Sequence, residues 1–169
     1  MGFMKRILSL ALTTFLALSL SSCMKKKGDQ YAGIDGDYVS GTPLSERADG
    51  ANFFGANVQR GHFPPVYFGF DSYEVSSSEQ GTIDQVASAL RSSGKTLIVA
   101  GFTDERGTEE YNRGLGERRA LAVREALINA GLNASKVQTV SFGKEMPADS
   151  GSGEAAWAKN RRAEFGVTQ

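Results

Sequence analysis

Strand-like and helix-like segments alternate along the chain from residue 64 onward, and this alternation is what most restricts its fold. Runs rich in apolar, aromatic and β-branched residues are typical of strands. They occur at 66–70, 96–101, 137–142 and 162–168. Between them lie two long segments with apolar residues at helical spacing and a shorter helical segment at 153–160. This order predicts an α/β (α+β) two-layer sandwich, in which two main helices and one short helix accompany a mixed four-stranded sheet.

The two main helices have recognisable boundaries in the sequence. Before the first helix, Ser76 and Ser77 each begin a capping-box pattern, completed by Glu79 and Gln80, and Gly94 is placed to end that helix. The second helix is expected from about 109 to 130, ending at Gly131. Between the helices the strand at 96–101 is almost continuously apolar, which indicates a position inside the sheet.

The second helix carries an arginine where its buried face is expected. At 100° per residue, one apolar stripe should face the sheet, formed by Leu115, Ala122, Val123, Ala126 and Ala130. Four charged side chains point away from this stripe and should be solvated: Glu110, Arg113, Glu117 and Arg124. Asn112 and Arg119 break the pattern, because both fall within the stripe.

Two interpretations of Arg119 remain open. A buried, unpaired charge is strongly disfavoured. In the structural interpretation the side chain makes an internal salt bridge or snorkels to solvent, and in the functional one it faces a pocket that takes a carboxylate. Asp104 and Asp71 each follow a strand, and ligands of α/β sheets collect beyond strand ends. An Asp in such a loop is also often an N-cap or a turn former. Together, Asp104 and Arg119 could hold an ammonium beside a carboxylate, which is the form of a free amino-acid end.

The N-terminal segment is predicted to be a lipoprotein signal peptide spanning residues 1–22. The uncharged run from Ile7 to Leu20 follows Lys5 and Arg6, and as a helix it would be about 21 Å long, short of the roughly 30 Å of a bilayer core. Leu20-Ser21-Ser22-Cys23 then fits a bacterial lipobox, so Cys23 is the predicted lipidation site. The alternative is an ordinary signal peptide followed by an incidental free thiol.

Residues 23–61 are predicted to be a lipidated flexible tether, and residues 62–169 the folded domain. Glycine recurs through the tether region, and no helical or strand period persists there. Phe53, Phe54 and Val58 do not fit a fully solvated linker, so docking of these side chains on the domain is left open.

Four motifs resemble the peptidoglycan-associated lipoprotein family, part of the wider group with an OmpA-like C-terminal domain. They are VYFGFDSYEV (66–75), GFTDERGTEEYNRGLGERRALAV (101–123), VSFGKEMP (140–147) and AKNRRAEF (158–165). The resemblance covers about residues 64–168 and implies an OmpA-like domain that binds peptidoglycan non-covalently through meso-diaminopimelate of the stem peptide. It further implies a lipid anchor in the outer membrane, a domain facing the periplasm, and Tol-system proteins as candidate partners.

The resemblance also assigns roles to individual residues. Asp104 and Arg119 match the pair that holds the amine and carboxylate of diaminopimelate, and Asp71 matches an aspartate that lines the same site. Asn112 matches a residue expected to brace the loop. Three further residues match positions near the site: Thr103, Arg106 and Leu115. The chain departs from the family at Phe102, where His or Tyr is usual, so a polar contact from that position would be lost.

Composition weighs against other classes of function. The 19 basic and 19 acidic residues balance, so nothing suggests a nucleic-acid binder. The only histidine, His62, lies at the edge of the tether and the domain has no cysteine, which removes Ser-His-Asp and Cys-His catalysis. Asp71 and Asp104 could form a glycosidase pair, but Arg119 would lower their pKa values, which is wrong for a general acid. We therefore expect no enzymatic activity, no cofactor and no metal site.

One alternative function is left open by the sequence. The domain could be a protein-interaction module of an envelope complex, with little direct contact to the wall. The charged, exposed face of the second helix could contribute to such an interface.

Overall fold

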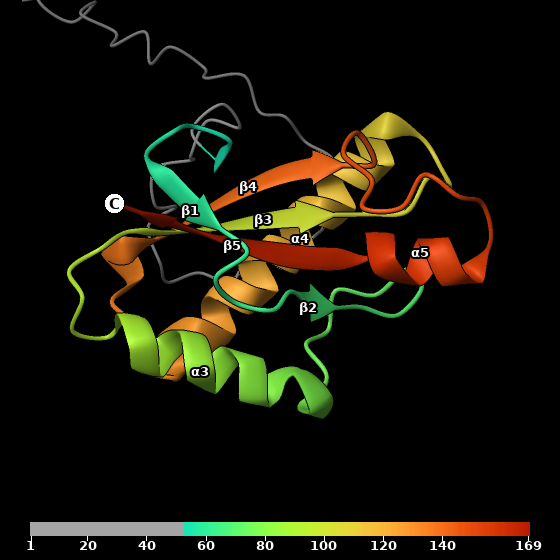
Figure 1. The fold of residues 1–169 in the computed structure, drawn as a ribbon. Helices are drawn as coiled ribbons and strands as arrows, with labels where there is room; N and C mark the ends of the chain where they lie inside the picture. The colour runs from blue at the N-terminus through green and yellow to red at the C-terminus, as the bar shows by residue number, and fades with distance from the viewer. Residues whose placement is uncertain (1–52) are drawn as a thin grey trace, which may run out of the picture. The chain divides into compact units, whose positions relative to one another are not determined.

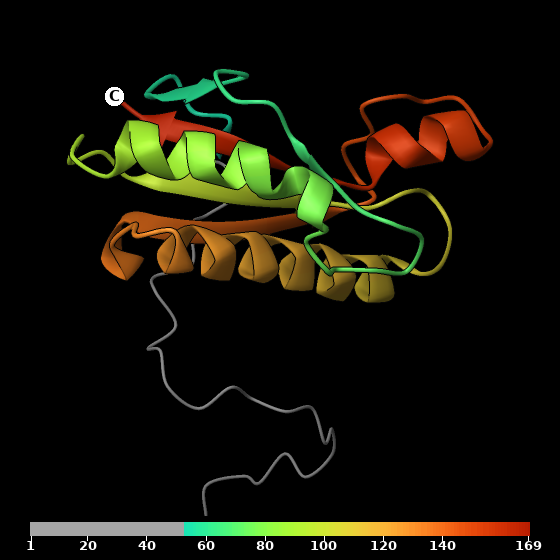
Figure 2. The same ribbon diagram turned by 90° about the horizontal axis from the view of Figure 1, so that it is seen from below.

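The computed structural model describes residues 53–169, and within them a mixed sheet carries two long helices on one face (Figures 1 and 2). The predicted signal peptide, Cys23 and the tether before residue 53 lie outside the described residues. The elements in chain order are β1 (Val58–Arg60), β2 (Val66–Tyr67), a 3-10 turn (Ser77–Glu79), α3 (Gln80–Leu90), β3 (Leu97–Phe102), α4 (Glu109–Asn129), a second 3-10 turn (Ala134–Lys136), β4 (Val137–Gly143), α5 (Glu154–Asn160) and β5 (Arg162–Thr168).

The described sheet has five strands rather than the expected four. Its order is β1-β5-β3-β4, and β2 pairs with a separate part of β5. β3 and β4 are parallel, whereas every pairing with β5 is antiparallel. β3 lies between β5 and β4, which confirms the interior position that its apolar sequence predicted.

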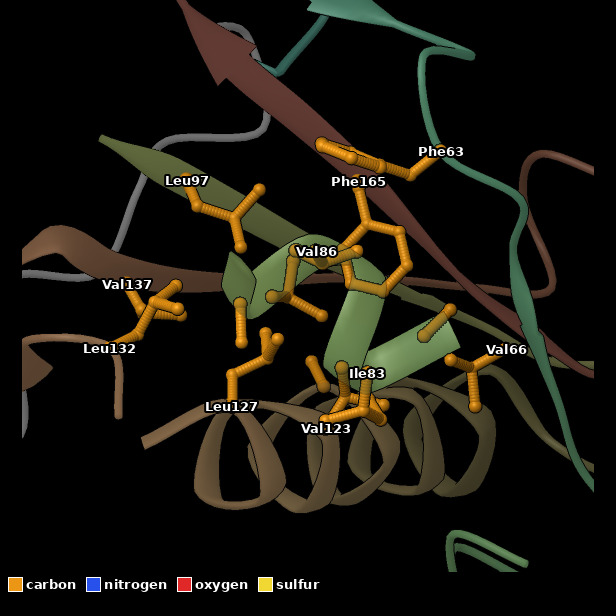
Figure 3. Close-up of a cluster of buried hydrophobic side chains, with 14 of the residues drawn as sticks. Phe63, Val66, Ile83, Val86, Leu97, Val123, Leu127, Leu132, Val137 and Phe165 are labelled. Carbon is orange, nitrogen blue, oxygen red and sulfur yellow. The ribbon is translucent and has the colours of Figure 1, made fainter. Parts of the chain in front are cut away.

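The main core lies between the sheet and the helices α3 and α4 (Figure 3). Leu97 and Val99 face this core, whereas Ile98 and Ala100 point to the other face of the sheet, as alternation along a strand requires. The predicted inward face of β5 is also confirmed, because its alternate side chains are buried in the same core: Ala163, Phe165 and Val167. Helices cover this face since an apolar sheet surface must be buried against another element.

The opposite face of the sheet is covered by the start of the described chain. Phe53 is fully buried against a second cluster that includes Ile98 and Phe102, and its ring centroid lies 5.8 Å from that of Phe142. Phe54 packs edge-on against Phe142, with centroids 4.9 Å apart. Val58 pairs with Thr168 at the start of β1. The docking left open from the sequence is therefore what the structure shows, and residues 53–61 pack on the domain instead of continuing the tether.

The segment between β2 and α3 is less regular than the sequence predicted. The strand expected at 66–70 pairs with β5 only over Val66–Tyr67. A turn at Gly69–Ser72 then changes the chain direction, with Asp71 in the left-handed region at φ 53°. The predicted capping boxes do not form, because Ser76 Oγ bonds Ser78 Oγ and makes no bond to the helix backbone. A 3-10 turn instead leads into α3.

Helix α4 follows its predicted limits, but its buried face is wider than one stripe. Thr108 caps it by accepting a hydrogen bond from Tyr111 N. Leu115 and Val123 are buried as predicted, and Leu127 joins them. Arg124, expected to be solvated, is buried, because its guanidinium donates to the backbone oxygens of Val137 (2.9 Å) and Ala134 (3.1 Å) at the start of β4.

α4 and β3 pack backbone against backbone where two glycines, Gly101 and Gly116, face each other. A Cβ on Gly101 would lie 1.9 Å from Gly116 O, and a Cβ on Gly116 would lie 2.4 Å from Ser141 Oγ. Only hydrogen atoms therefore fit at this crossing. The crossing fixes the loop after Gly101 relative to Arg119, which follows Gly116 by three residues along the helix.

Candidate ligand-binding site

A cavity of about 250 Å³ opens where the loop after β2, the loop after β3 and the first half of α4 meet. It is lined by Phe70, Asp71, Thr103, Asp104, Arg106, Gly107, Tyr111, Asn112, Leu115 and Arg119. All seven residues that the sequence placed in or near the site therefore line one cavity. The sequence interpretation missed Phe70, Gly107 and Tyr111, although each is a direct neighbour of a charged residue or a turn within the same motifs.

Asp104 is a buried carboxylate surrounded by guanidinium groups. Its Oδ1 accepts hydrogen bonds from Arg106 N (3.2 Å) and Nε (3.1 Å), and its Oδ2 accepts from Arg106 Nη2 (2.6 Å) and Arg161 Nη1 (3.4 Å). Burial raises the pKa of Asp104, but the hydrogen bonds and charge of Arg106, together with Arg161, outweigh it and hold the pKa below its ordinary value. The carboxylate is therefore ionised at neutral pH.

Arg119 is fully buried and is held by backbone oxygens. Its Nε donates to Ser72 O (2.8 Å), its Nη1 to Phe102 O (2.8 Å) and its Nη2 to Gly69 O (3.2 Å). Neither an internal salt bridge nor snorkelling, the two structural interpretations from the sequence, describes this arrangement. Three of the five guanidinium N–H groups make these bonds, so donors remain for a ligand.

The charge of Arg119 is retained despite burial. Loss of solvent lowers the pKa of Arg119 to about 10, while the nearby charge of Asp104 acts in the opposite direction. A guanidinium with that pKa is protonated at neutral pH. The cavity therefore contains a positive group that is compensated mainly by carbonyl dipoles and more distant carboxylates, and an incoming anion would be attracted to it.

Asp71 is held in an unusual backbone conformation at the edge of the cavity. Its positive φ places a non-glycine residue in the left-handed region, which is uncommon but tolerated best by Asp and Asn. The Tyr111 hydroxyl donates to its carboxylate. This hydrogen bond raises the pKa of Tyr111, and burial and the charge of Asp71 act in the same direction. The bond fixes a second carboxylate on the cavity wall.

The loop after β3 is braced from within, as expected for Asn112. The Asn112 side-chain amide donates to Arg106 O (2.8 Å) and Thr108 O (2.9 Å), which ties the second half of the loop to α4. Lys144 Nζ donates to Gly107 O (2.8 Å) from the other side. Thr103 is buried, and its hydroxyl donates to Asp104 O (3.2 Å). These contacts set the position of Asp104 before any ligand arrives.

The rim of the cavity is aromatic. The Arg106 guanidinium lies 4.2 Å from the Phe70 ring centroid and 4.0 Å from that of Trp157, a residue of α5. The Trp157 indole N–H donates to Glu105 Oε1 (2.9 Å). Arg161, which follows α5, supplies the second cation on Asp104. Nothing in the sequence pattern assigns a role to Trp157 or Arg161, because only the fold brings α5 next to the loop after β3.

Phe102 does not face the cavity. Its side chain lies in the second cluster on the opposite face of the sheet, nearly parallel to Phe142 with ring centroids 5.3 Å apart. Arg162 lies 4.0 Å from the same ring. Phe in place of His or Tyr at this position therefore removes no polar contact from the cavity, because the side chain packs against the opposite face of the sheet.

The described residues contain neither a metal-type cluster nor a membrane-type helix. Among residues 53–169, no group of three or more His, Cys, Asp and Glu side chains is arranged to hold a metal ion. No helix in the same range is both long enough and apolar enough to span a bilayer.

The cavity combines groups of both charges at short range. Two carboxylates and one buried guanidinium face it, and a second guanidinium lies at its rim. Such a set can hold a ligand that carries an ammonium and a carboxylate close together, by charge-assisted hydrogen bonds to each.

Comparison with known proteins places the chain in a family. Residues 67–161 match the OmpA family. The chain is 44% identical over 126 residues to a peptidoglycan-associated lipoprotein of Pasteurella multocida, covering 73% of this chain and 84% of that protein. With the peptidoglycan-associated lipoprotein of Legionella pneumophila it shares 34% identity over 165 residues, 92% of each chain.

Solved structures show the same fold. The crystal structure of the peptidoglycan-associated lipoprotein from Burkholderia pseudomallei matches with a TM-score of 0.60 and 46% identity, over 62% of this chain and 89% of that one. The C-terminal domain of Helicobacter pylori MotB matches with a TM-score of 0.59 and 23% identity, over 63% of this chain and 85% of that one, which is a likeness of fold alone. On the sequence matches, the chain belongs to the OmpA family and, within it, to the peptidoglycan-associated lipoproteins.

Proposed function

We propose that this protein is an outer-membrane lipoprotein whose domain faces the periplasm and binds peptidoglycan through the side-chain end of meso-diaminopimelate. The observation that carries the proposal is the cavity in which Asp71, Asp104 and Arg119 meet. The relatives named above are called peptidoglycan-associated lipoproteins, which supports association with the wall. Binding would hold the outer membrane to the wall without any covalent step.

The two end groups of diaminopimelate have complementary partners in the cavity. The ligand's ammonium would bind the Asp104 carboxylate, with Asp71 adding negative charge nearby. The ligand's carboxylate would accept hydrogen bonds from the N–H groups of Arg119 that the backbone oxygens leave free. Because the guanidinium is already fixed by three carbonyls, little side-chain entropy is lost on binding.

Co-sedimentation with purified wall sacculi tests the proposal. One preparation carries diaminopimelate in its stem peptides, and the other carries lysine, which keeps the amine but lacks the second carboxylate. We expect the detergent-solubilised full chain to pellet selectively with the first. Asp104→Asn should lose most of this binding, whereas Glu110→Gln, an exposed change on the first turn of α4, should not.

The outcomes separate the possible ligands. Equal pelleting with both wall types would show that the carboxylate is not read, which contradicts the role of Arg119. Pelleting with neither would favour the alternative function, a protein-interaction module of an envelope complex such as the Tol system. Exposed aromatic side chains beside the cavity, Phe70, Tyr73 and Tyr111, are of the kind found at protein interfaces.

We also propose that Cys23 is acylated and anchors the chain in the outer membrane. Cys23→Ala is expected to release the protein from membranes while leaving wall binding intact, because one cysteine supplies the attachment point and two or more acyl chains are needed for stable anchoring. Fractionation should include a high-salt wash, since Lys25, Lys26 and Lys27 could bind anionic lipid by charge alone. Retention of the variant on washed membranes would argue against lipidation.

A further inference from the structure

The acceptor capacity of Asp104 is filled by the protein itself. A carboxylate has about four lone-pair positions, two on each oxygen. The structure shows two hydrogen bonds to Oδ1 and two to Oδ2. An ammonium that enters the cavity therefore finds no vacant acceptor on this carboxylate, and one of the present donors must leave before the ammonium can bind.

Arg106 and Arg161 share these bonds, and they differ in how firmly they are held. The Arg161 side chain is 7% exposed, and it also donates to Phe68 O (3.1 Å) and to Glu154 Oε1 (2.6 Å). The Arg106 side chain is 32% exposed, and beyond Asp104 its guanidinium contacts the Phe70 and Trp157 rings. Arg106 is therefore the donor that can leave without stranding a buried charge.

We propose that Arg106 is a specificity-determining residue of the cavity: its guanidinium occupies Asp104 in the free protein, is displaced by the ligand's ammonium, and then joins Arg119 in pairing with the ligand's carboxylate. This inference rests on the proposed function. It extends that function by giving a reason for selectivity between two amine-bearing stem peptides.

The selectivity follows from an exchange of ion pairs. A lysine side chain offers only an ammonium, so it replaces one cation on Asp104 by another and leaves Arg106 without a partner. Diaminopimelate offers an ammonium and a carboxylate. Its ammonium takes Asp104 from Arg106, and its carboxylate gives Arg106 a new partner. Occupation of Asp104 by Arg106 thus disfavours the lysine peptide, because its binding breaks the Arg106–Asp104 ion pair without replacing it. Specificity can arise in this way from a penalty on the competing ligand.

The only tryptophan of the chain lies where it can report this movement. Trp157 is stacked on the Arg106 guanidinium, with 4.0 Å between the guanidinium carbon and the ring centroid. Departure of the cation changes the surroundings of the indole. Tryptophan fluorescence of the unmodified protein is therefore a direct measure of where Arg106 lies.

The test uses the full chain in detergent and two tripeptide probes, L-Ala–γ-D-Glu–meso-diaminopimelate and the same peptide with lysine at the third position. Calorimetry gives the affinities and Trp157 fluorescence gives the displacement. We expect Arg106→Gln to bind the lysine peptide roughly 2- to 5-fold more tightly, the size of one partly exposed ion pair, and to lose preference for diaminopimelate by a similar factor. Arg113→Gln, which alters an exposed arginine paired with Glu145 outside the cavity, should behave as wild type.

Fluorescence separates displacement from a general change in the domain. Wild type should show a saturable change on adding the diaminopimelate peptide, with the same midpoint as calorimetry, and Arg106→Gln should show little change while still binding. Arg106→Lys keeps the charge but not the two-pronged contact, so its selectivity should lie between those of wild type and Arg106→Gln. Thermal melts should confirm that both variants are folded.

Four results would overturn the inference. Weaker binding of the lysine peptide by Arg106→Gln would make Arg106 a simple ligand contact. Unchanged selectivity, or binding without a Trp157 signal in wild type, would show that the guanidinium stays on Asp104; in these cases the proposed function stands. Failure of every variant, wild type included, to bind the diaminopimelate peptide would overturn both the inference and the proposed function.

Discussion

Arg119→Ala is expected to weaken both the fold and the wall binding. The substitution removes the guanidinium donor from three backbone oxygens, those of Gly69, Ser72 and Phe102, and of these Gly69 O keeps a long hydrogen bond from Ser72 N (3.4 Å). Each unsatisfied buried group costs about 1–3 kcal/mol, and removal of one member of a buried polar network costs about 3–5 kcal/mol in all. Urea denaturation should therefore show a clear loss in the free energy of unfolding. In sedimentation assays, loss of the cation should remove about 2–4 kcal/mol of ligand binding.

Two further variants separate stability from recognition. Arg118→Ala changes the neighbouring arginine, which is exposed and lies over Tyr73, and it should leave both quantities nearly unchanged. Arg119→Lys keeps the positive charge without the planar fork, so we expect a smaller loss of stability and a substantial loss of wall binding. Wall binding by a folded Arg119→Ala protein at the wild-type level would contradict the assignment of Arg119 to the ligand carboxylate.

Gly101→Ala is expected to prevent normal folding. The added methyl group would meet the backbone oxygen of Gly116 at 1.9 Å, and neither backbone can yield without moving α4 away from β3. Overpacking against backbone in a buried crossing belongs to the rare class of changes that cost more than about 4 kcal/mol. Soluble yield and the midpoint of thermal unfolding should both fall sharply.

Gly81→Ala is the matched control for this substitution. Gly81 lies in α3, and a Cβ there meets nothing within 4 Å. Alanine is a better helix former than glycine by about 0.8–1 kcal/mol, so this variant should be slightly more stable than wild type. If Gly101→Ala instead melts within a few degrees of wild type, the close crossing of α4 and β3 does not need glycine.

The parts of the fold that the sequence predicted are those with a strong local pattern. β3 is an apolar run, α4 has apolar residues at helical spacing and a terminal glycine, and β5 alternates along its length, so each could be placed to within about one residue. β1 has only three residues and no apolar alternation, and it exists because β5 offers an unpaired edge. Such a strand is defined by its partner, and Val58 of β1 pairs with Thr168 of β5, which lies 110 residues further along the chain.

The site shows the same division between local and long-range information. The helical spacing placed Arg119 on the buried face correctly, and the motifs identified seven of the residues that line the cavity. Helical spacing could not identify the hydrogen-bond partners of Arg119, because Gly69 and Ser72 lie 50 and 47 residues before it in the chain. The pairing of Asp104 with Arg161 spans 57 residues and has no periodic signature.

The way the chain enters the domain has a mechanical consequence. Tension applied to the chain ahead of residue 53 would act first on the contacts of Phe53 with the outer face of the sheet and then on β1, which three residue pairs join to β5. The cavity is lined by residues from Phe70 to Arg119, none of which belongs to this entry segment. A pull on the N-terminal side could thus extend the molecule by separating residues 53–60 from the sheet while the cavity keeps its shape.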